Sequence, residues 1–246
     1  MSVLSPLRKL RKRWKAFWYV NWIKTYYFNL KKFPFKTAMK LPVFIYRDYK
    51  LTNISGKVVI DAPIKRGMIG FGHSFEVRKR SAGLGEIVIA GTVVFKGNVH
   101  IERDVYFQVG YGAYCEIGNF SSLGSQVIFI CRERIVLGDY VRVTYQSQVL
   151  DSIFHQLIDL KTNTKKPKTA PVELGNYNWI GNRSTIMKGT KTPDHTTVGS
   201  NSLCNKDYTD LGNYIVIGGV PAKLLQTEIK RDWEGEQYIL DNLLVK

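Results

Sequence analysis

The sequence predicts a mainly β protein, a parallel β-helix of six-residue repeats with a helical segment at each end. Two observations predict this fold. Apolar residues recur at every sixth position, and glycine often follows directly. The repeat positions are Ile89, Phe95, Ile101 and Phe107; Ile117, Leu123 and Phe129; Leu137, Val143 and Val149; and Leu174, Ile180, Ile186, Thr192, Val198 and Cys204.

The six-residue period has a simple geometric explanation. A short strand and a tight turn make one repeat, and three repeats close a triangular coil that stacks on its neighbours. Glycine follows the repeat residue at Gly118, Gly124 and Gly181, where its freedom at positive φ suits a crowded corner. The alternative is a β-sandwich, which predicts strands every 8 to 12 residues or so with apolar–polar alternation. The six-residue period favours the β-helix.

The first fifty residues are set apart by their charge. They contain 13 Lys or Arg residues and one acid, Asp48, and so account for +12 of the formal net charge of +16. Such a segment attracts the phosphates of anionic lipid or nucleic acid, or a polyanionic glycan. No nucleic-acid recognition motif accompanies the charge, so nucleic acid is not an expected partner. We predict a basic, aromatic-rich helical segment at 1–50, a β-helix at 51–220 and a C-terminal helix at 221–246.

Within the basic segment, residues 3–31 resemble an aromatic-rich helix. Steps of three to four residues bring Trp14, Phe17, Trp18 and Trp22 near one face. One interpretation is an interfacial helix that lies on an anionic membrane. The other is a helix that packs on its own β-helix or on a neighbouring subunit. The sequence leaves both open.

No segment has the features of a membrane span or a signal peptide. The apolar run at 16–23 is interrupted by Asn21 and stopped by Lys24, whereas a span needs about 20 apolar residues. We therefore expect a cytoplasmic protein, with peripheral contact at the inner membrane face through the basic segment. No Cys/His cluster has the spacing of a metal site, so we expect no metal and three reduced cysteines. The cysteines are Cys115, Cys131 and Cys204.

The repeat is broken twice. Residues 156–173 do not fit the period and are rich in lysine and proline, which predicts a loop extruded between coils. After Cys204 the period fails again, and Pro221 is a good first-turn helix residue. The spacing of apolar residues predicts a helix over 221–244, which would cover the open end of the coil stack.

One histidine stands out from the four in the chain. His155 ends the run Val149–His155 directly before the predicted loop, with Asp151 and Asp159 on either side. A histidine that titrates near neutral pH and is oriented by an acceptor is a natural base for an alcohol that attacks a thioester. His73 and His100 look structural, and His195 is expected in a turn.

Four segments resemble motifs of one enzyme family. Residues 178–189 resemble the Trp-Ile-Gly turn of hexapeptide-repeat acyltransferases. Residues 198–207 and 218–223 are similar to that family's later glycine-rich run and its Gly-Asn-Pro-Ala-Lys signature. Residues 150–155 resemble the Asp-x-Asp-Phe-His catalytic segment of the branch that acetylates sugars in capsule and O-antigen clusters. The similarity covers roughly residues 89–233.

The chain departs from the family pattern at a few positions. Ile153 stands where the second aspartate of the catalytic segment is usual, and Val220 stands where asparagine is usual. Thr192-Pro193 and Cys204 replace repeat aliphatics. The change at Ile153 leaves Asp151, Asp159 or a backbone carbonyl to orient His155.

The resemblance implies a left-handed coil and a homotrimer with active sites between subunits. It implies acetyl-CoA as the acyl donor and a sugar or glycan hydroxyl as the acceptor. By the same resemblance, His155 removes the proton from the hydroxyl and Asp151 belongs to the catalytic site. The loop at 156–173 would form a wall of that site.

The family pattern also implies a set of residues that hold coenzyme A. Trp179 would lie beside the pantetheine arm, or alternatively pack at a trimer interface. Turn backbone at Gly199 and Ser200 would bond the pantetheine amides. Lys206 and Lys223 would face the phosphates, or be solvated surface lysines.

Several other functions compete with O-acetylation of a cell-surface glycan or its precursor. N-acetylation of an amino sugar would use the same base and donor. A serine acetyltransferase carries a different N-terminal domain, and a carbonic anhydrase would need a trio of metal-binding histidines. The non-enzymatic alternative is a β-helix scaffold with a membrane-binding arm and a decayed site. Ile153 favours the scaffold, whereas His155 and the donor-site run favour the enzyme.

Overall fold

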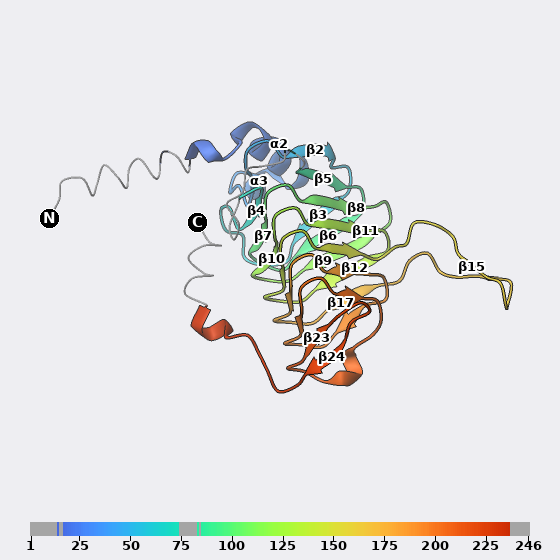
Figure 1. Ribbon diagram of the computed structural model, residues 1–246. Coiled ribbons are helices and arrows are strands. Elements are labelled where there is room, and N and C mark those ends of the chain that lie inside the picture. Colours follow the sequence, from blue (N-terminus) through green and yellow to red (C-terminus); the bar gives the residue numbers. More distant parts are fainter. Residues whose placement is uncertain (1–13, 15–16, 74–82, 84, 237–246) are drawn as a thin grey trace.

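The computed structural model describes residues 14, 17–73, 83 and 85–236, and it confirms the parallel β-helix. Three parallel sheets form the three sides of the coil (Figure 1). Sheet I contains β1 (Val43–Ile45), β4 (Ile69–Phe71), β7 (Val99–Ile101), β10 (Ser121–Leu123), β13 (Arg142–Val143), β18 (Trp179–Ile180), β21 (Thr197–Val198) and β23 (Val216–Gly218).

The other two sides are built in the same way. Sheet II contains β2 (Lys50–Asn53), β5 (Glu86–Ile89), β8 (Tyr106–Val109), β11 (Ile128–Cys131), β14 (Gln148–Leu150), β19 (Thr185–Ile186) and β22 (Leu203–Cys204). Sheet III contains β3 (Lys57–Ile60), β6 (Thr92–Phe95), β9 (Tyr114–Ile117), β12 (Arg134–Leu137), β17 (Val172–Leu174) and β20 (Lys191–Thr192). Successive coils thus place each strand beside its counterpart.

The core is the column of repeat residues inside the coil. Every predicted repeat position is buried, including Thr192 and Cys204, which are 4% and 0% exposed. The stacking is direct, since the rings of Phe107 and Phe129 on neighbouring coils lie 5.0 Å apart and nearly parallel. The three cysteines are free and buried. Stability therefore comes from contacts between coils, as in other solenoids.

The N-terminal end of the β-helix is covered by helix α2 (Trp22–Lys32), followed by the short helix α3 (Phe35–Ala38) (Figure 1). Strand β1 lies before residue 51 and β2 begins at Lys50, so the coil begins earlier than the predicted boundary. Most of the helix expected at 3–31 lies outside the described residues. Within the described part of the chain, no helix is both long and apolar enough to cross a bilayer.

The loop predicted at 156–173 is a projecting hairpin. Strands β15 (Ile158–Asp159) and β16 (Thr164–Lys165) pair antiparallel and stand away from the coils (Figure 1). Its base is closed by an antiparallel bridge between Ser152 and Thr169. The chain rejoins the coil at β17, so the excursion ends slightly before the predicted boundary.

The C-terminal end differs from the prediction of a helix over 221–244. After a 3-10 turn, η1 (Thr209–Leu211), and β23, the chain reverses through 219–222 and forms β24 (Lys223–Gln226), antiparallel to β23. The reason is physical: the last strand of sheet I leaves an unpaired backbone edge, and pairing satisfies it. Helical residues begin at Trp233 and run to Glu236; residues 237–246 lie outside the described part.

One corner of the coil, between sheets III and I, repeats a Gly-Asx-aromatic triplet, and we name it the closed corner. Its triplets are 118–120, 138–140, 175–177 and 212–214, with Pro193-Asp194-His195 between the last two. Three of the Asx side chains accept a hydrogen bond from the Asx amide of the preceding coil: Asp139 from Asn119 N at 2.6 Å, Asn176 from Asp139 N at 2.8 Å and Asp194 from Asn176 N at 2.7 Å.

The aromatic members of the closed corner all have positive φ, between 55° and 61°, and their rings stack into a column. The ring centres of Tyr140 and Tyr177 are 4.9 Å apart, those of Tyr177 and His195 are 4.7 Å apart, and those of His195 and Tyr214 are 4.6 Å apart. Phe120 continues the column beyond Tyr140. Ring stacking of this kind contributes to stability beyond area burial.

Candidate active site

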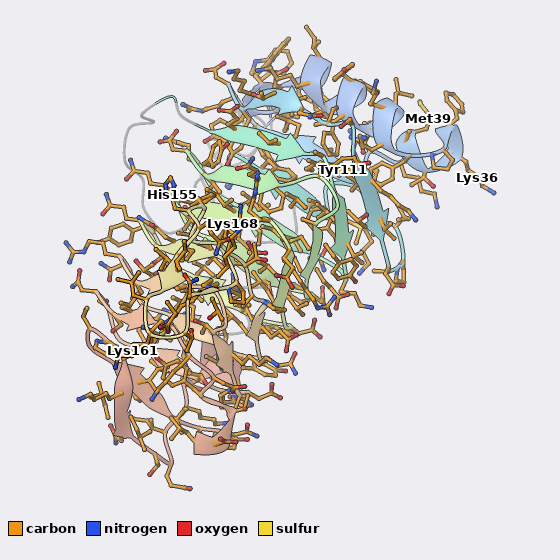
Figure 2. All side chains as sticks on the ribbon, turned by 90° about the vertical axis from the view of Figure 1, so that its right-hand side faces the viewer. Lys36, Met39, Tyr111, His155, Lys161 and Lys168 are labelled. Atoms are coloured by element: carbon orange, nitrogen blue, oxygen red, sulfur yellow. The ribbon has the colours of Figure 1, made fainter. Side chains whose placement is uncertain are left out.

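His155 lies at the base of the projecting hairpin, at the corner between sheets II and III, which we name the open corner (Figure 2). Its side chain is exposed, and its backbone N–H donates to Ile153 O at 2.6 Å across Phe154, whose φ is 59°. The amide of Ile153 in turn donates to Lys168 O at 3.0 Å. The backbone that holds His155 is therefore hydrogen-bonded to the segment that leads from the hairpin back to the coil.

Asp151 does not contact His155 through its carboxylate. The side chain is fully buried, and its oxygens accept hydrogen bonds from the amides of Arg132, Glu133 and Arg134 at 2.7 to 2.8 Å. Those three amides belong to the same corner, one coil earlier. The backbone carbonyl of Asp151 also accepts from Ala170 N at 3.1 Å. The geometry makes Asp151 a positioning residue that fixes the base of the hairpin.

The second neighbouring acid is occupied as well. Asp159 forms an ion pair with Lys166 at 3.4 Å and accepts a hydrogen bond from the amide of Lys161. Within the described part of the chain, no hydrogen bond joins the His155 ring to either carboxylate. The expectation that Asp151 or Asp159 orients the histidine has no support in this geometry, because both are held elsewhere.

Burial lowers the pKa of two histidines outside this corner, His100 and His195. Desolvation holds the pKa of fully buried His100 at about 4, so this ring is neutral near pH 7. Desolvation also lowers the pKa of His195, which lies in the closed corner. Both therefore fit the structural roles expected of them.

Trp179 lies in β18 on the outer face of sheet I. Its side chain is 37% exposed, and the Arg231 guanidinium lies 5.2 Å from the centre of its indole. The same guanidinium lies 4.5 Å from the ring of Trp233, which is buried against the closed corner. Trp179 thus has an accessible indole, held by a cation that the sequence did not single out.

Gly199 and Ser200 form the turn that follows β21, at the corner between sheets I and II. The amide of Gly199 donates to Ile217 O at 2.8 Å, and its carbonyl accepts from the hydroxyl of Ser184. The Ser200 hydroxyl donates to Asn182 Oδ1 at 2.6 Å. The Gly199 amide is therefore committed to the coil ladder, which weighs against its expected bond to pantetheine.

Lys206 and Lys223 both lie at the C-terminal end of the coil stack. Lys206 follows β22 at the open corner, with its ammonium 5.4 Å from the Tyr208 ring centre. Lys223 begins β24, opposite Gly218. Both side chains are exposed, as an anion-binding role requires.

The structure brings the expected residues together in two groups. Trp179, Gly199 and Ser200 lie on adjacent coils, since Trp179 pairs with Thr197 directly before that turn. His155 lies at a different corner, across sheet II. In the described residues no cluster of three or more His, Cys, Asp or Glu could hold a metal ion.

Comparison with known proteins finds relatives among acetyltransferases. The chain is 25% identical over 167 residues to galactoside O-acetyltransferase of Escherichia coli K12, a match that covers 67% of this chain and 77% of the relative. The chain is thus similar to the hexapeptide-repeat acetyltransferases. No family model matches it.

Two further proteins are similar to this chain. A chloramphenicol acetyltransferase of Morganella morganii is 40% identical over 67 residues, which span 27% of this chain and only 29% of the relative. Among solved structures, the polySia-specific acetyltransferase NeuO superposes with a TM-score of 0.46 at 17% identity, over 77% of this chain and 78% of that one. The structural match concerns the fold alone.

Proposed function

We propose that this acetyltransferase moves an acetyl group from acetyl-CoA to a sugar hydroxyl of a cell-surface glycan or its precursor, with His155 as the general base. The observation that carries the proposal is the placement of an exposed histidine on backbone tied at the base of the hairpin. The galactoside O-acetyltransferase relative acts, by its name, on an oxygen of a galactoside. That supports an oxygen acceptor on a sugar.

The proposed chemistry is direct transfer. A ring nitrogen of His155 takes the proton of the acceptor hydroxyl as its oxygen forms a bond to the acetyl carbonyl carbon. The carbon–sulfur bond then breaks, and the imidazolium returns the proton to the coenzyme A thiolate. A backbone N–H at a coil turn would stabilise the intermediate oxyanion. Asp151 contributes to the reaction indirectly, because its carboxylate fixes the backbone at the base of the hairpin that bears His155.

Coenzyme A fits the exposed groups of the chain. Lys206 and Lys223 offer cations for its phosphates, and the accessible indole of Trp179 offers an apolar surface for the pantetheine arm. The two groups of site residues lie at different corners of one chain, so we propose a homotrimer in which a neighbouring chain completes each site.

The test is thiol release from acetyl-CoA by the wild type and by His155→Ala, against a panel of simple sugars, amino sugars and oligosaccharides. The proposal expects release that requires a hydroxyl acceptor and is lost in the variant. Alkali-resistant acetylation of an amino sugar would indicate N-acetylation instead. Coenzyme A binding with no turnover on any acceptor would support the scaffold. Sedimentation equilibrium tests the trimer.

A further inference from the structure

Helix α2 turns its polar face toward the β-helix. Thr25, Phe28 and Asn29 are buried against strand β1. The Thr25 hydroxyl accepts from Ile45 N at 3.0 Å, while Asn29 accepts from Val43 N at 3.2 Å and donates to Val43 O at 2.7 Å. These side chains satisfy the open edge of the first coil. The two polar residues of the inner face thus pair with backbone, while Phe28 joins the core.

The outer face of α2 carries an apolar stripe. Ile23, Tyr26, Tyr27 and Leu30 have the i, i+3, i+4, i+7 spacing of one helix face, and they are between 42% and 84% exposed. A surface helix of a soluble protein normally buries such a stripe and exposes its polar residues. In α2 the apolar stripe is exposed, and the polar residues Thr25 and Asn29 are buried.

The stripe continues on both sides of α2. Contacts between aromatic rings, 4.8 to 6.3 Å between centres, link Trp14 to Trp18, Trp18 to Phe17, Phe17 to Trp22, and Trp22 to Tyr26. Past the helix, Phe35 and Met39 of the α3 region are 73% and 52% exposed. We name the exposed apolar residues from Trp14 to Met39 the N-terminal apolar surface. In Figure 2 the labelled Lys36 and Met39 lie at its end, far from the hairpin. A surface of this extent marks an interaction site.

The charge around this surface is mainly positive, although Asp48 lies with Arg47 beside Trp14 and Trp18. The sequence has no Asp or Glu between residues 14 and 47, while the side chains of Lys31, Lys36 and Lys40 are exposed. A second copy docked on the same surface would bring like charges together. A soluble polyanion would pair with the lysines and leave the apolar residues in water. An anionic bilayer satisfies both, because its headgroups pair with lysine and its interface takes Trp, Tyr and Leu.

We propose that the N-terminal apolar surface docks this end of the β-helix on a bilayer that contains anionic lipid. The helix would lie in the interfacial plane, with the coil axis directed away from the lipid. This role is independent of acetyl transfer.

The first test removes the apolar stripe. The full-length triple variant Ile23→Ser, Tyr27→Ser, Leu30→Ser is compared with the wild type in flotation with phosphatidylcholine vesicles that contain phosphatidylglycerol. The matched control, Tyr111→Ser, Leu160→Ser, Val220→Ser, removes three apolar side chains that are 73% to 94% exposed elsewhere. We expect vesicle binding to fall at least about tenfold in the stripe variant and to stay unchanged in the control.

The second test removes the charge. Lys31→Gln, Lys36→Gln, Lys40→Gln should weaken binding at low salt by roughly a hundredfold, since each cation near an anionic surface is worth about 1 kcal/mol. The control replaces three exposed hairpin lysines, Lys161, Lys165 and Lys168, by Gln. Thermal unfolding of every variant verifies that the fold is kept.

Three results would overturn the proposal. One is wild-type protein that does not float with anionic vesicles. Another is binding that the stripe variant retains, or that pure phosphatidylcholine supports equally. The third is self-association in sedimentation velocity that is lost with the stripe, which would assign the surface to a second copy.

Discussion

Two corners of the same coil are built for different purposes. The closed corner repeats one triplet on coil after coil, and its Asx amides and stacked rings form continuous ladders. Among the described residues, the open corner has no such ladder of Asx side chains and stacked rings, because the chain leaves it as a hairpin and the buried carboxylate of Asp151 bonds the backbone there. Repetition gives stability, and the interruption gives an exposed histidine. The comparison predicts that changes at the open corner affect activity and changes at the closed corner affect stability.

The largest expected effect is on catalysis at the open corner. His155→Ala should lower kcat by about a thousandfold, since general-base catalysis typically contributes 10²–10⁴-fold. The free energy of unfolding should change little because the side chain is exposed. Steady-state kinetics and thermal unfolding measure the two quantities. The control is His195→Ala, which should lower the free energy of unfolding and leave kcat unchanged. An equal loss of kcat in both variants would contradict the comparison.

The next effect is on stability at the same corner. Asp151→Ala leaves three partly buried amides without an acceptor and should lower the free energy of unfolding by about 3 kcal/mol. Asp139→Ala is the control, since this exposed side chain accepts one amide and should cost about 1 kcal/mol. Urea unfolding measures both. A cost no greater than the control's would show that Asp151 does not hold the hairpin base.

A smaller effect is expected in the aromatic column. Tyr177→Ala removes ring contacts with Tyr140 and His195, and it should cost about 1 to 2 kcal/mol of unfolding free energy with kcat unchanged. Tyr111→Ala, at a 94% exposed position, should cost less than about 0.5 kcal/mol. If both cost the same, the column would have no stabilising role.

The smallest effect is a pH dependence. Because burial lowers the pKa of His195 in the folded chain, the unfolded chain binds its proton more readily. The stability contributed by the neutral ring is present above the unfolded pKa, near 6.5, and is lost as pH falls through that value. The drop in Tm between pH 7.5 and 5.5 should be slightly smaller in His195→Phe than in the wild type. An identical drop would exclude this ring as a contributor.

Much of this architecture was predictable from the sequence. Every repeat position that the six-residue period identified is buried, including Thr192 and Cys204, because any side chain of suitable size can fill the coil interior. The break at 156–173 predicted a loop extruded between coils, and the structure shows that this loop is a hairpin. The Gly-Asx-aromatic triplet was visible at 118–120 and 138–140 and could have predicted the closed corner, had the residues after each glycine been aligned.

Other features depend on partners distant in sequence. The spacing of Leu224 and Leu225 predicted a helix, but these residues pair with the open edge of β23 instead. That edge exists only after the coil has formed, so the local sequence does not reveal it. Asp151 next to His155 suggested a catalytic pair. Its real partners are amides 17 to 19 residues earlier, which no local pattern reveals.

The regular stacking of strands also acts as a ruler. In sheet II, strand β14, which leads to His155, is four strands beyond β2, next to the end that α2 covers. At about 4.8 Å per strand, the hairpin base lies about 20 Å along the axis from that end. If the coil docks on a membrane and His155 is the base, as proposed, this height would favour an acceptor that extends from the bilayer, such as a glycan on a lipid anchor, over a lipid headgroup. The number of coils before the hairpin would thus set which part of a growing chain is acetylated.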